Sequence, residues 1–510
     1  MTRWNRRFWV MVGTVLVLRV LYAWVFPLDL APDESYYWDW GRRLDIGYYS
    51  KPPMVGWLMG LAGFLGGNTQ FGVKVFPAVL ATAALVFVYL LGRSMFGARA
   101  GFWAAALMVA SPAAVALGAF FTIDAPLMLF WSASLYFAWR CLQEGANHSW
   151  RNTLLLVACL GLGFLTKQIH CLFPLLYLLA LAATAGLRPA AQPVRVAAVV
   201  GLPFLFLLPP VLWNWRHDWI TFRHTVEELE DRPWQLSRSL KFVGEFLGGQ
   251  AGLGGGITWI LMMLALAIAV RGWRTRNPQG RFLLAFSLPG VLAFLGLSVF
   301  QRVEQNWPMV FYVAAAVLAA GWLAREEAPP RAGASALKWA VRLGGFLGVA
   351  LMLVPFVLPW SPWAGSKSDP TARVRGWREL ATAVEPVRRA VPRPERTLVL
   401  APDDRYAASA LAFYLPDQPR TFCWESKDRL ESQYGIWGRP GAEWAGWDAL
   451  VIARNPLDAK LKDVAQRFDK WESRGTITLS LGRQKARDRR YVVFVGQGYR
   501  PPETVGTGGK

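Results

Sequence analysis

Long apolar stretches recur through the first 360 residues of this chain, and they constrain its fold more than any other feature. A helix needs roughly 17–22 apolar residues to cross a hydrocarbon core about 30 Å thick. Inside lipid, its backbone groups have to be satisfied within the helix itself. We therefore predict a mainly α-helical membrane bundle with about eleven transmembrane helices. The predicted spans are residues 8–27, 71–91, 101–119, 124–140, 153–167, 171–187, 196–213, 252–270, 282–300, 308–323 and 341–360.

The charge pattern predicts the orientation of the bundle. The chain carries a net charge of +21 and its composition is 54% hydrophobic. No nucleic-acid motif accompanies this charge, so we expect no nucleic-acid partner. Arginines stand before the first span and again in every second connection, as at Arg93 and Arg99, which is the pattern of cytoplasmic loops in contact with membrane lipids. We predict a multi-pass protein of the cell (inner) membrane, with a cytoplasmic N-terminus and an extracytoplasmic C-terminus.

The composition changes after about Ser361, where proline and charged residues become more frequent. Short β-branched runs alternate there with helical segments, which predicts a small α/β domain. Residues 1–360 would form the catalytic membrane domain and 361–510 the extracytoplasmic domain. The predicted strands are 397–400, 449–452 and 491–494, and the predicted helices are 371–390, 404–415 and 456–473.

An acidic pair, Asp33-Glu34, follows the first apolar stretch at the mouth of the membrane. Aromatic residues, Tyr37 among them, surround it. Charge at such a depth is costly and tends to mark function. Pro32 followed by acids also suits the first turn of a helix, so a capping role is the plain alternative. We predict a catalytic carboxylate here, Asp33 more than Glu34, with Tyr37 in contact with substrate.

A second acid, Asp124, lies in the predicted outer turn between two spans and precedes Pro126. The plain alternative is again a helix cap. Two carboxylates at one interface could instead divide the base and substrate-orienting roles, or share a divalent cation such as Mg²⁺ or Mn²⁺. We predict Asp124 as a second catalytic residue and no certain cofactor.

Three basic side chains stand at predicted outer turns. Lys51 lies on the stiff Lys51-Pro52-Pro53 turn, and Lys167 and His170 share another turn. Each lysine could simply anchor to lipid headgroups or extend its charge to the interface. The functional alternative is that they bind the phosphate of a lipid-linked substrate, which acids alone would repel.

Two further connections carry aromatic and polar residues. The predicted outer connection 213–250 begins with Trp213, Arg216 and His217. Its aromatics fit either an interfacial belt or a groove for sugar or lipid. In Gln301–Pro308, Glu304 and Asn306 look like a buried acid and amide at the start of a helix. We predict that all five side chains contact substrate.

Five motifs resemble, in order, those of the GT-C fold glycosyltransferases, the superfamily of protein O-mannosyltransferases and lipid A aminoarabinose transferases. The resemblance covers about residues 10–325 and, more loosely, Ala408–Leu415 and Gln433–Trp437. The motifs are Asp33-Glu34-Ser35-Tyr36-Tyr37-Trp38, Lys51-Pro52-Pro53, Thr122-Ile123-Asp124-Ala125-Pro126, Leu165-Thr166-Lys167 and Asn306-Trp307-Pro308.

This resemblance implies an inverting transfer of a sugar from a polyprenyl-phosphate donor to a lipid, glycan or protein acceptor at the outer membrane face. It implies that Asp33 is the catalytic acid group of the first outer loop and Asp124 the second acidic position. Lys51 would lie near the donor phosphate. The tail matches only loosely, so the acceptor does not follow from the resemblance.

Other classes of function fit the sequence less well. A ligase for another polyprenyl-linked glycan is the nearest alternative enzyme. A membrane transporter or flippase of a lipid-linked glycan would more often show internal repeats or charges near the middle of the membrane. A scaffold without activity would leave the shared occurrence of Asp33, Asp124 and Lys51 unexplained.

Overall fold

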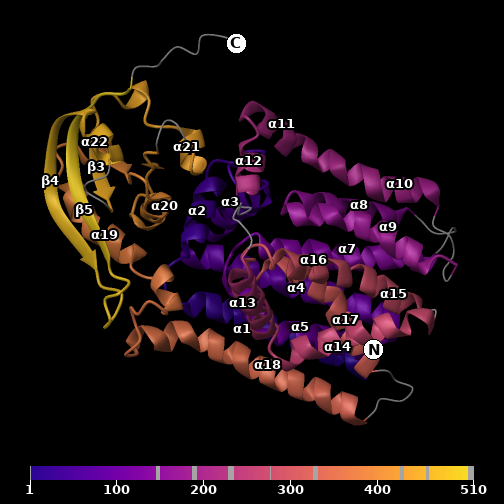
Figure 1. The fold of residues 1–510 in the computed structure, drawn as a ribbon. Coiled ribbons are helices and arrows are strands. Elements are labelled where there is room, and N and C mark those ends of the chain that lie inside the picture. The colour runs from indigo at the N-terminus through magenta and orange to yellow at the C-terminus, as the bar shows by residue number, and fades with distance from the viewer. Residues whose placement is uncertain are drawn as a thin grey trace. The chain divides into compact units, whose positions relative to one another are not determined.

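The computed structural model describes residues 2–144, 150–186, 192–227, 235–275, 277–324, 331–425, 430–454 and 459–502. These residues form two compact units (Figure 1). The helical unit consists of Met1–Val25, Lys51–Val55 and Lys74–Met352, and the sheet unit of Phe26–Ser50, Gly56–Val73 and Leu353–Lys510. The predicted functional boundary at residue 360 stays a prediction. The acidic motif, however, belongs to the same compact unit as the tail, which its position in the sequence does not suggest.

The helical unit has a buried centre and an apolar outside. Helix α17 is buried along nearly its whole length, among residues of α5, α14 and α15. The unit contains α1 (Arg3–Val25), α5 (Ala98–Val109), α6 (Pro112–Ala119), α7 (Asp124–Glu144), α8 (Arg151–Phe164), η2 (Gln168–Leu172), α9 (Phe173–Thr184), α10 (Pro193–Gly201), η3 (Leu202–Leu207), α11 (Leu208–Arg216), α12 (Ile220–Glu227), α13 (Leu236–Leu253), α14 (Ile257–Arg271), η4 (Gly272–Thr275), α15 (Pro278–Ala285), α16 (Leu288–Leu297), η5 (Trp307–Val310), α17 (Phe311–Leu323), and most of α4 (Gln70–Phe96) and α18 (Arg331–Val357).

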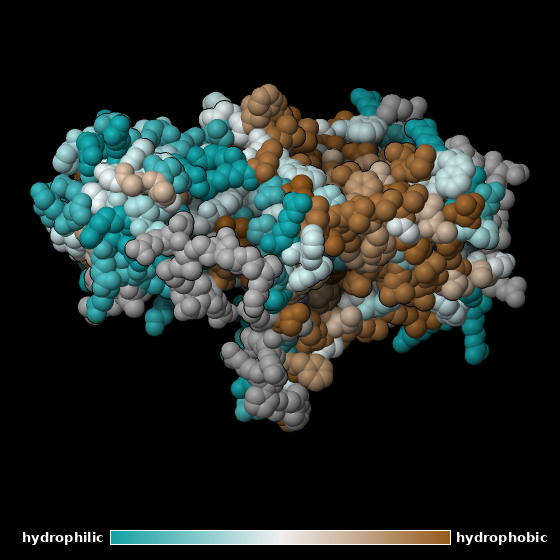
Figure 2. Space-filling model, turned by 90° about the horizontal axis from the view of Figure 1, so that it is seen from above, coloured by the Kyte–Doolittle hydropathy of each residue, from teal (hydrophilic) through white to brown (hydrophobic). Residues whose placement is uncertain are grey.

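Large apolar side chains on the outside of these helices are what a lipid-facing surface requires. Trp24 is 70% exposed and Phe346 is 69% exposed. Figure 2 shows a broad brown area of such residues. Among the described residues, six helices are long and apolar enough to span a membrane, or seven if α5 and α6, bent by 71°, form one span. The protein is therefore a multi-pass membrane protein, and the count of eleven stays a prediction.

The long outer loop predicted from Trp213 is largely helical where the structure describes it. Helix α12 starts at Ile220, and α13 runs from Leu236 to Leu253. Few residues of α12 and α13 are fully buried, and polar residues interrupt their apolar pattern. This pattern explains why the sequence indicated a loop.

The sheet unit is an α/β structure. Its five strands lie in the order β2-β1-β3-β5-β4, with β1 parallel to β2 and β3, and β5 antiparallel to β3 and β4. Its elements are α2 (Pro32–Gly41), most of α3 (Met54–Gly66), η6 (Leu358–Trp360), η7 (Pro370–Val374), α19 (Trp377–Arg389), η8 (Pro394–Arg396), β1 (Thr397–Leu400), α20 (Arg405–Tyr414), β2 (Thr421–Phe422), α21 (Gln433–Trp437), η9 (Ala442–Trp444), β3 (Asp448–Ala453), α22 (Ala459–Ala465), β4 (Phe468–Leu479) and β5 (Arg489–Tyr499).

All three predicted strands form, as β1, β3 and β5, while the buried two-residue strand β2 was not predicted. The prediction of a helix over 456–473 is wrong in its second half, since α22 ends at Ala465 and β4 begins at Phe468. Nearly all of β4 is exposed, so it lacks the alternation that marks a half-buried strand. Its conformation comes from pairing with β5, which no local pattern reveals.

Candidate functional site

Glu34 has a structural task at the start of α2. Its Oε2 accepts the backbone N–H of Ala31 at 2.8 Å, which is the glutamate half of a capping box, since Ala31 has no side-chain oxygen to complete it. The side chain is completely buried. The capping alternative therefore fits Glu34, and its catalytic role stays a prediction.

Asp33 points away from this cap. Its side chain is 37% exposed and pairs with Arg373 at 3.2 Å. The hydroxyl of Tyr406 donates to its other oxygen at 3.4 Å. The carboxylate is thus oriented by two polar groups of the same unit while part of it stays accessible, as a base requires.

The tail segments that resemble the bacterial transferases bind the helix that carries Asp33. Ser409 contacts Ser35 at 3.0 Å between hydroxyl oxygens, and the backbone N–H of Gln433 donates to the hydroxyl of Tyr36 at 2.6 Å. The hydroxyl of Tyr414 accepts the N–H of Leu30 at 2.6 Å. Sequence reasoning did not connect these segments with α2, although it singled out both.

Two more residues of α2 belong to this packing. Tyr37 is buried against Trp40, with ring centroids 4.9 Å apart, so the structure gives it a packing role. Asp39 was not predicted as a site residue. It is fully buried, pairs with Arg42 at 2.5 Å and accepts a hydrogen bond from Tyr434 at 2.7 Å. The hydrogen bond from Tyr434 links α2 to the tail, whereas the ion pair with Arg42 lies at the end of the same helix.

Within the helical unit, three predicted site residues meet. The Nζ of Lys167 lies 3.0 Å from Asp124 Oδ1, and the amide of Asn306 donates to Asp124 Oδ2 at 2.7 Å. Both members of the ion pair are only 13% exposed. Three motifs far apart in the sequence thus form one polar cluster.

Lys51 and His170 belong to the same unit. The segment of Lys51 is close to the Lys167 motif, since the N–H of Met54 donates to the carbonyl of Leu165 at 3.0 Å. His170 is fully buried between aromatic rings, 5.2 Å from that of Trp131, and its Nε2 lies 3.4 Å from Ser134 Oγ. These are the surroundings of a packed core histidine.

The remaining residues that were predicted to contact substrate differ in how deeply they are buried. Trp213 is buried and stacks on His217 at 4.0 Å, while Arg216 is exposed at the end of α11. The expectation that Glu304 is buried is wrong, because its side chain is exposed. Only its carbonyl has a structural role, accepting the N–H of Trp307 at 3.1 Å.

Comparisons with known proteins show what this chain resembles as a whole. The model of the family "Dolichyl-phosphate-mannose-protein mannosyltransferase" matches residues 50–213, a range that contains Lys51, Asp124 and Lys167 but not Asp33. ArnT from Cupriavidus metallidurans, in its apo crystal structure, superimposes with a TM-score of 0.61 over 96% of this chain and 98% of ArnT, at 16% identity.

This chain has the fold of ArnT. The GT-C resemblance predicted from five short motifs is thereby confirmed. Two curated relatives are glycosyltransferases by name. Lipid A galacturonosyltransferase RgtD from Rhizobium johnstonii is 30% identical over 58% of this chain and 60% of its own length. Undecaprenyl phosphate-alpha-4-amino-4-deoxy-L-arabinose arabinosyl transferase 1 from Pseudomonas fluorescens is 27% identical over 52% of this chain and 51% of its own. The matches thus span half to three fifths of these relatives.

The predicted acids of both units are occupied by positively charged or amide partners rather than free to bind a divalent cation. Both oxygens of Asp124 are already engaged by Lys167 and Asn306, and Asp33 pairs with a guanidinium. Within the described ranges, no three His, Cys, Asp or Glu side chains lie close enough to hold a metal ion. The donor set in each unit therefore does not fit a divalent cation.

Proposed function

We propose that this protein is a membrane glycosyltransferase that moves a sugar from a polyprenyl-phosphate donor to a lipid, glycan or protein acceptor. The transfer takes place at the outer face of the inner membrane. The chain crosses the membrane about eleven times, with its N-terminus in the cytoplasm and residues 361–510 outside.

The observation that carries this proposal is the cluster of Asp124, Lys167 and Asn306. Asp124 and Asn306 are 182 residues apart in the sequence, yet their side chains share a hydrogen bond. A chance occurrence of short motifs would not bring them together. The ArnT fold and the names of the relatives support the same class of reaction.

In the proposed reaction, Asp33 accepts the proton of the acceptor hydroxyl. The hydroxyl oxygen bonds to the anomeric carbon of the sugar from the face opposite the phosphate, which inverts that centre. The bond from this carbon to the phosphate oxygen breaks, and polyprenyl phosphate leaves with the electron pair. Lys51 stabilises the negative charge on the leaving phosphate, as preorganised cations do in such transition states.

Asp124 has a different role from Asp33 in this scheme. It holds Lys167 and Asn306 in fixed positions, so that their remaining donors can orient the donor head group. The two carboxylates then divide the work: one removes a proton and the other fixes the site. Arg373 and Tyr406 orient Asp33.

The test is mass spectrometry of membrane lipids and glycans from cells with and without this chain. A sugar modification should disappear without it, return with the wild-type chain, and stay absent with Asp33→Asn. A flippase would instead move a lipid-linked glycan with Asp33→Asn as well as with the wild type. Restoration by Asp33→Asn at equal expression would therefore contradict the proposal.

A further inference from the structure

The topology of the sheet predicts a binding site at one of its edges, the edge formed by the carboxyl ends of the parallel strands. Strand β1 lies between β2 and β3, and all three are parallel. The chain leaves β1 through α20 to β2 on one side and later enters β3 on the other. In open sheets of this kind, ligands bind beyond the carboxyl ends of the strands, where the connections diverge.

Two cavities occupy this edge. They measure ≈ 480 Å³ and ≈ 240 Å³ and share Asp404, Tyr406 and Arg454. Asp404 and Tyr406 follow β1, and Arg454 follows β3. The shared residues make the two cavities parts of one polar region, which we call the carboxyl-edge pocket.

The acids of this pocket are already compensated. Lys460 pairs with both Asp403 and Glu431, and Arg375 pairs with Asp369. Burial raises the pKa of Asp404 and of Glu425, and both carboxyl groups accept backbone N–H hydrogen bonds. Asp488 likewise accepts the N–H of Leu481 at 2.9 Å.

Two arginines of the pocket donate hydrogen bonds to neutral backbone carbonyls rather than to carboxylates. Arg405 donates to the carbonyl of Glu431 at 3.0 Å, and Arg489 to the carbonyl of Ala372 at 2.8 Å. Arg454 is exposed, and no hydrogen bond or ion pair with another described residue engages its guanidinium, although its charge acts on the nearby carboxyl group of Asp404. A guanidinium in this state is a ready donor pair for an anion.

Asp33 borders this pocket through two of its lining residues, Arg373 and Tyr406. We infer that the carboxyl-edge pocket binds a phosphate or carboxylate group of the acceptor, with Arg454 as its main contact. The inference rests on the proposed function, because it takes Asp33 as the base. The anion would hold the acceptor so that a neighbouring hydroxyl faces Asp33.

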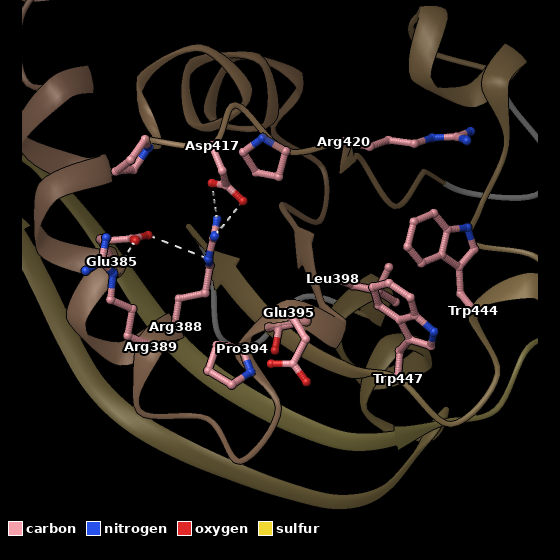
Figure 3. A pocket seen from close by; sticks show the side chains of 13 residues that line it. Glu385, Arg388, Arg389, Pro394, Glu395, Leu398, Asp417, Arg420, Trp444 and Trp447 are labelled. Atoms are coloured by element: carbon pink, nitrogen blue, oxygen red, sulfur yellow. Dashed lines mark hydrogen bonds and ion pairs between the residues drawn. The ribbon is translucent and has the colours of Figure 1, made fainter.

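A cavity at the opposite edge of the same sheet provides a contrast. It measures ≈ 350 Å³ and lies near the amino ends of β1 and β3. Figure 3 shows Arg388 in contact with Asp417 and Glu385. Trp444 and Trp447 lie on the other side of the cavity. Two of its three arginines, Arg388 and Arg389, are held in ion pairs by the acids of the same cavity. Its exposed Arg420 is a matched control for Arg454.

The first test measures anion binding without catalysis. The full-length protein in detergent is titrated with inorganic phosphate, or with free glucuronate, at constant ionic strength, and the shift in thermal midpoint gives the dissociation constant. Arg454→Gln should weaken binding about tenfold, Arg454→Lys less, and Arg420→Gln not at all. Tighter binding of phosphate or of glucuronate identifies the acceptor group. Equal binding by Arg454→Gln and wild type, or none by either, would overturn the inference.

The second test assigns the anion to the acceptor. Arg454→Gln should raise KM for the acceptor about tenfold and leave KM for the lipid-linked donor unchanged. A rise in the donor KM instead would overturn this assignment. Asp33→Asn should retain phosphate binding. If Asp33→Asn keeps transferring sugar, the proposed base is refuted, while the phosphate titration still decides whether the pocket exists.

Discussion

At the residue scale, the adjacent acids Asp33 and Glu34 have different tasks. The carboxylate of Glu34 accepts a backbone hydrogen bond at the start of α2. The carboxylate of Asp33 is partly exposed to solvent and is bound by Arg373 and Tyr406. Sequence reasoning could favour Asp33 but could not show why. The reason is a contact between residues 340 positions apart.

The cluster around Asp124 makes a prediction at the same scale. Asp124→Asn and Lys167→Met should each reduce transfer, and the double variant should lose little more than either alone, because the two side chains act as one unit. A coupling free energy of about 1–3 kcal/mol is expected from the double-mutant cycle. Purified proteins at matched expression provide the rates. Additive losses would mean that the ion pair does not act as a unit in the reaction.

At the element scale, the sequence predicts those helices and strands whose buried residues form a regular apolar pattern. The strands β1, β3 and β5 were found, the two-residue strand β2 was not, and each predicted span covers one or more helices where the structure describes it. The exposed strand β4 and the helical part of the 213–250 connection were missed, since neither carries an apolar alternation. The packing of α2 on α20 was also missed, because it depends on the tertiary fold alone.

The turn before α19 is held together by the buried carboxylate of Asp369. The contribution of this carboxylate to the stability of the fold should depend on pH. Burial opposes ionisation of Asp369, but hydrogen bonds from Thr371 and Gly365 and the charge of Arg375 outweigh it and lower its pKa. A lowered pKa stabilises the folded state above the unfolded pKa of about 3.9, and this contribution is lost as pH falls through the folded value. Asp369→Asn should therefore cost about 2–4 kcal/mol at neutral pH.

Thermal unfolding of the purified variants between pH 3 and pH 8 checks this prediction. The gap between Asp369→Asn and wild type should narrow only below about pH 4. Asp469, which pairs with Arg500 on the surface and is 64% exposed, is the matched control. Asp469→Asn should cost less than about 0.5 kcal/mol. A gap for Asp369→Asn that does not change with pH would show that its charge is unimportant.

At the scale of the whole molecule, the proposed orientation can be measured directly. Glu472 on β4 and Arg274 in η4 are both exposed. In a chain without its four natural cysteines, Glu472→Cys should react with a membrane-impermeant maleimide in intact spheroplasts. Arg274→Cys should react only after permeabilisation. Labelling of both from the same side would refute the topology read from the basic connections.

The central claim is that Asp33 removes the proton of the acceptor in a sugar transfer. The most direct measurement compares the release of polyprenyl phosphate by purified wild type, Asp33→Asn and Glu34→Gln, with donor and acceptor present. Loss of a general base should slow Asp33→Asn by about 10²–10⁴-fold. Glu34→Gln should stay within a few fold of wild type, because glutamine preserves the capping hydrogen bond. Near-normal release by Asp33→Asn, or an equal loss in both variants, would contradict the account.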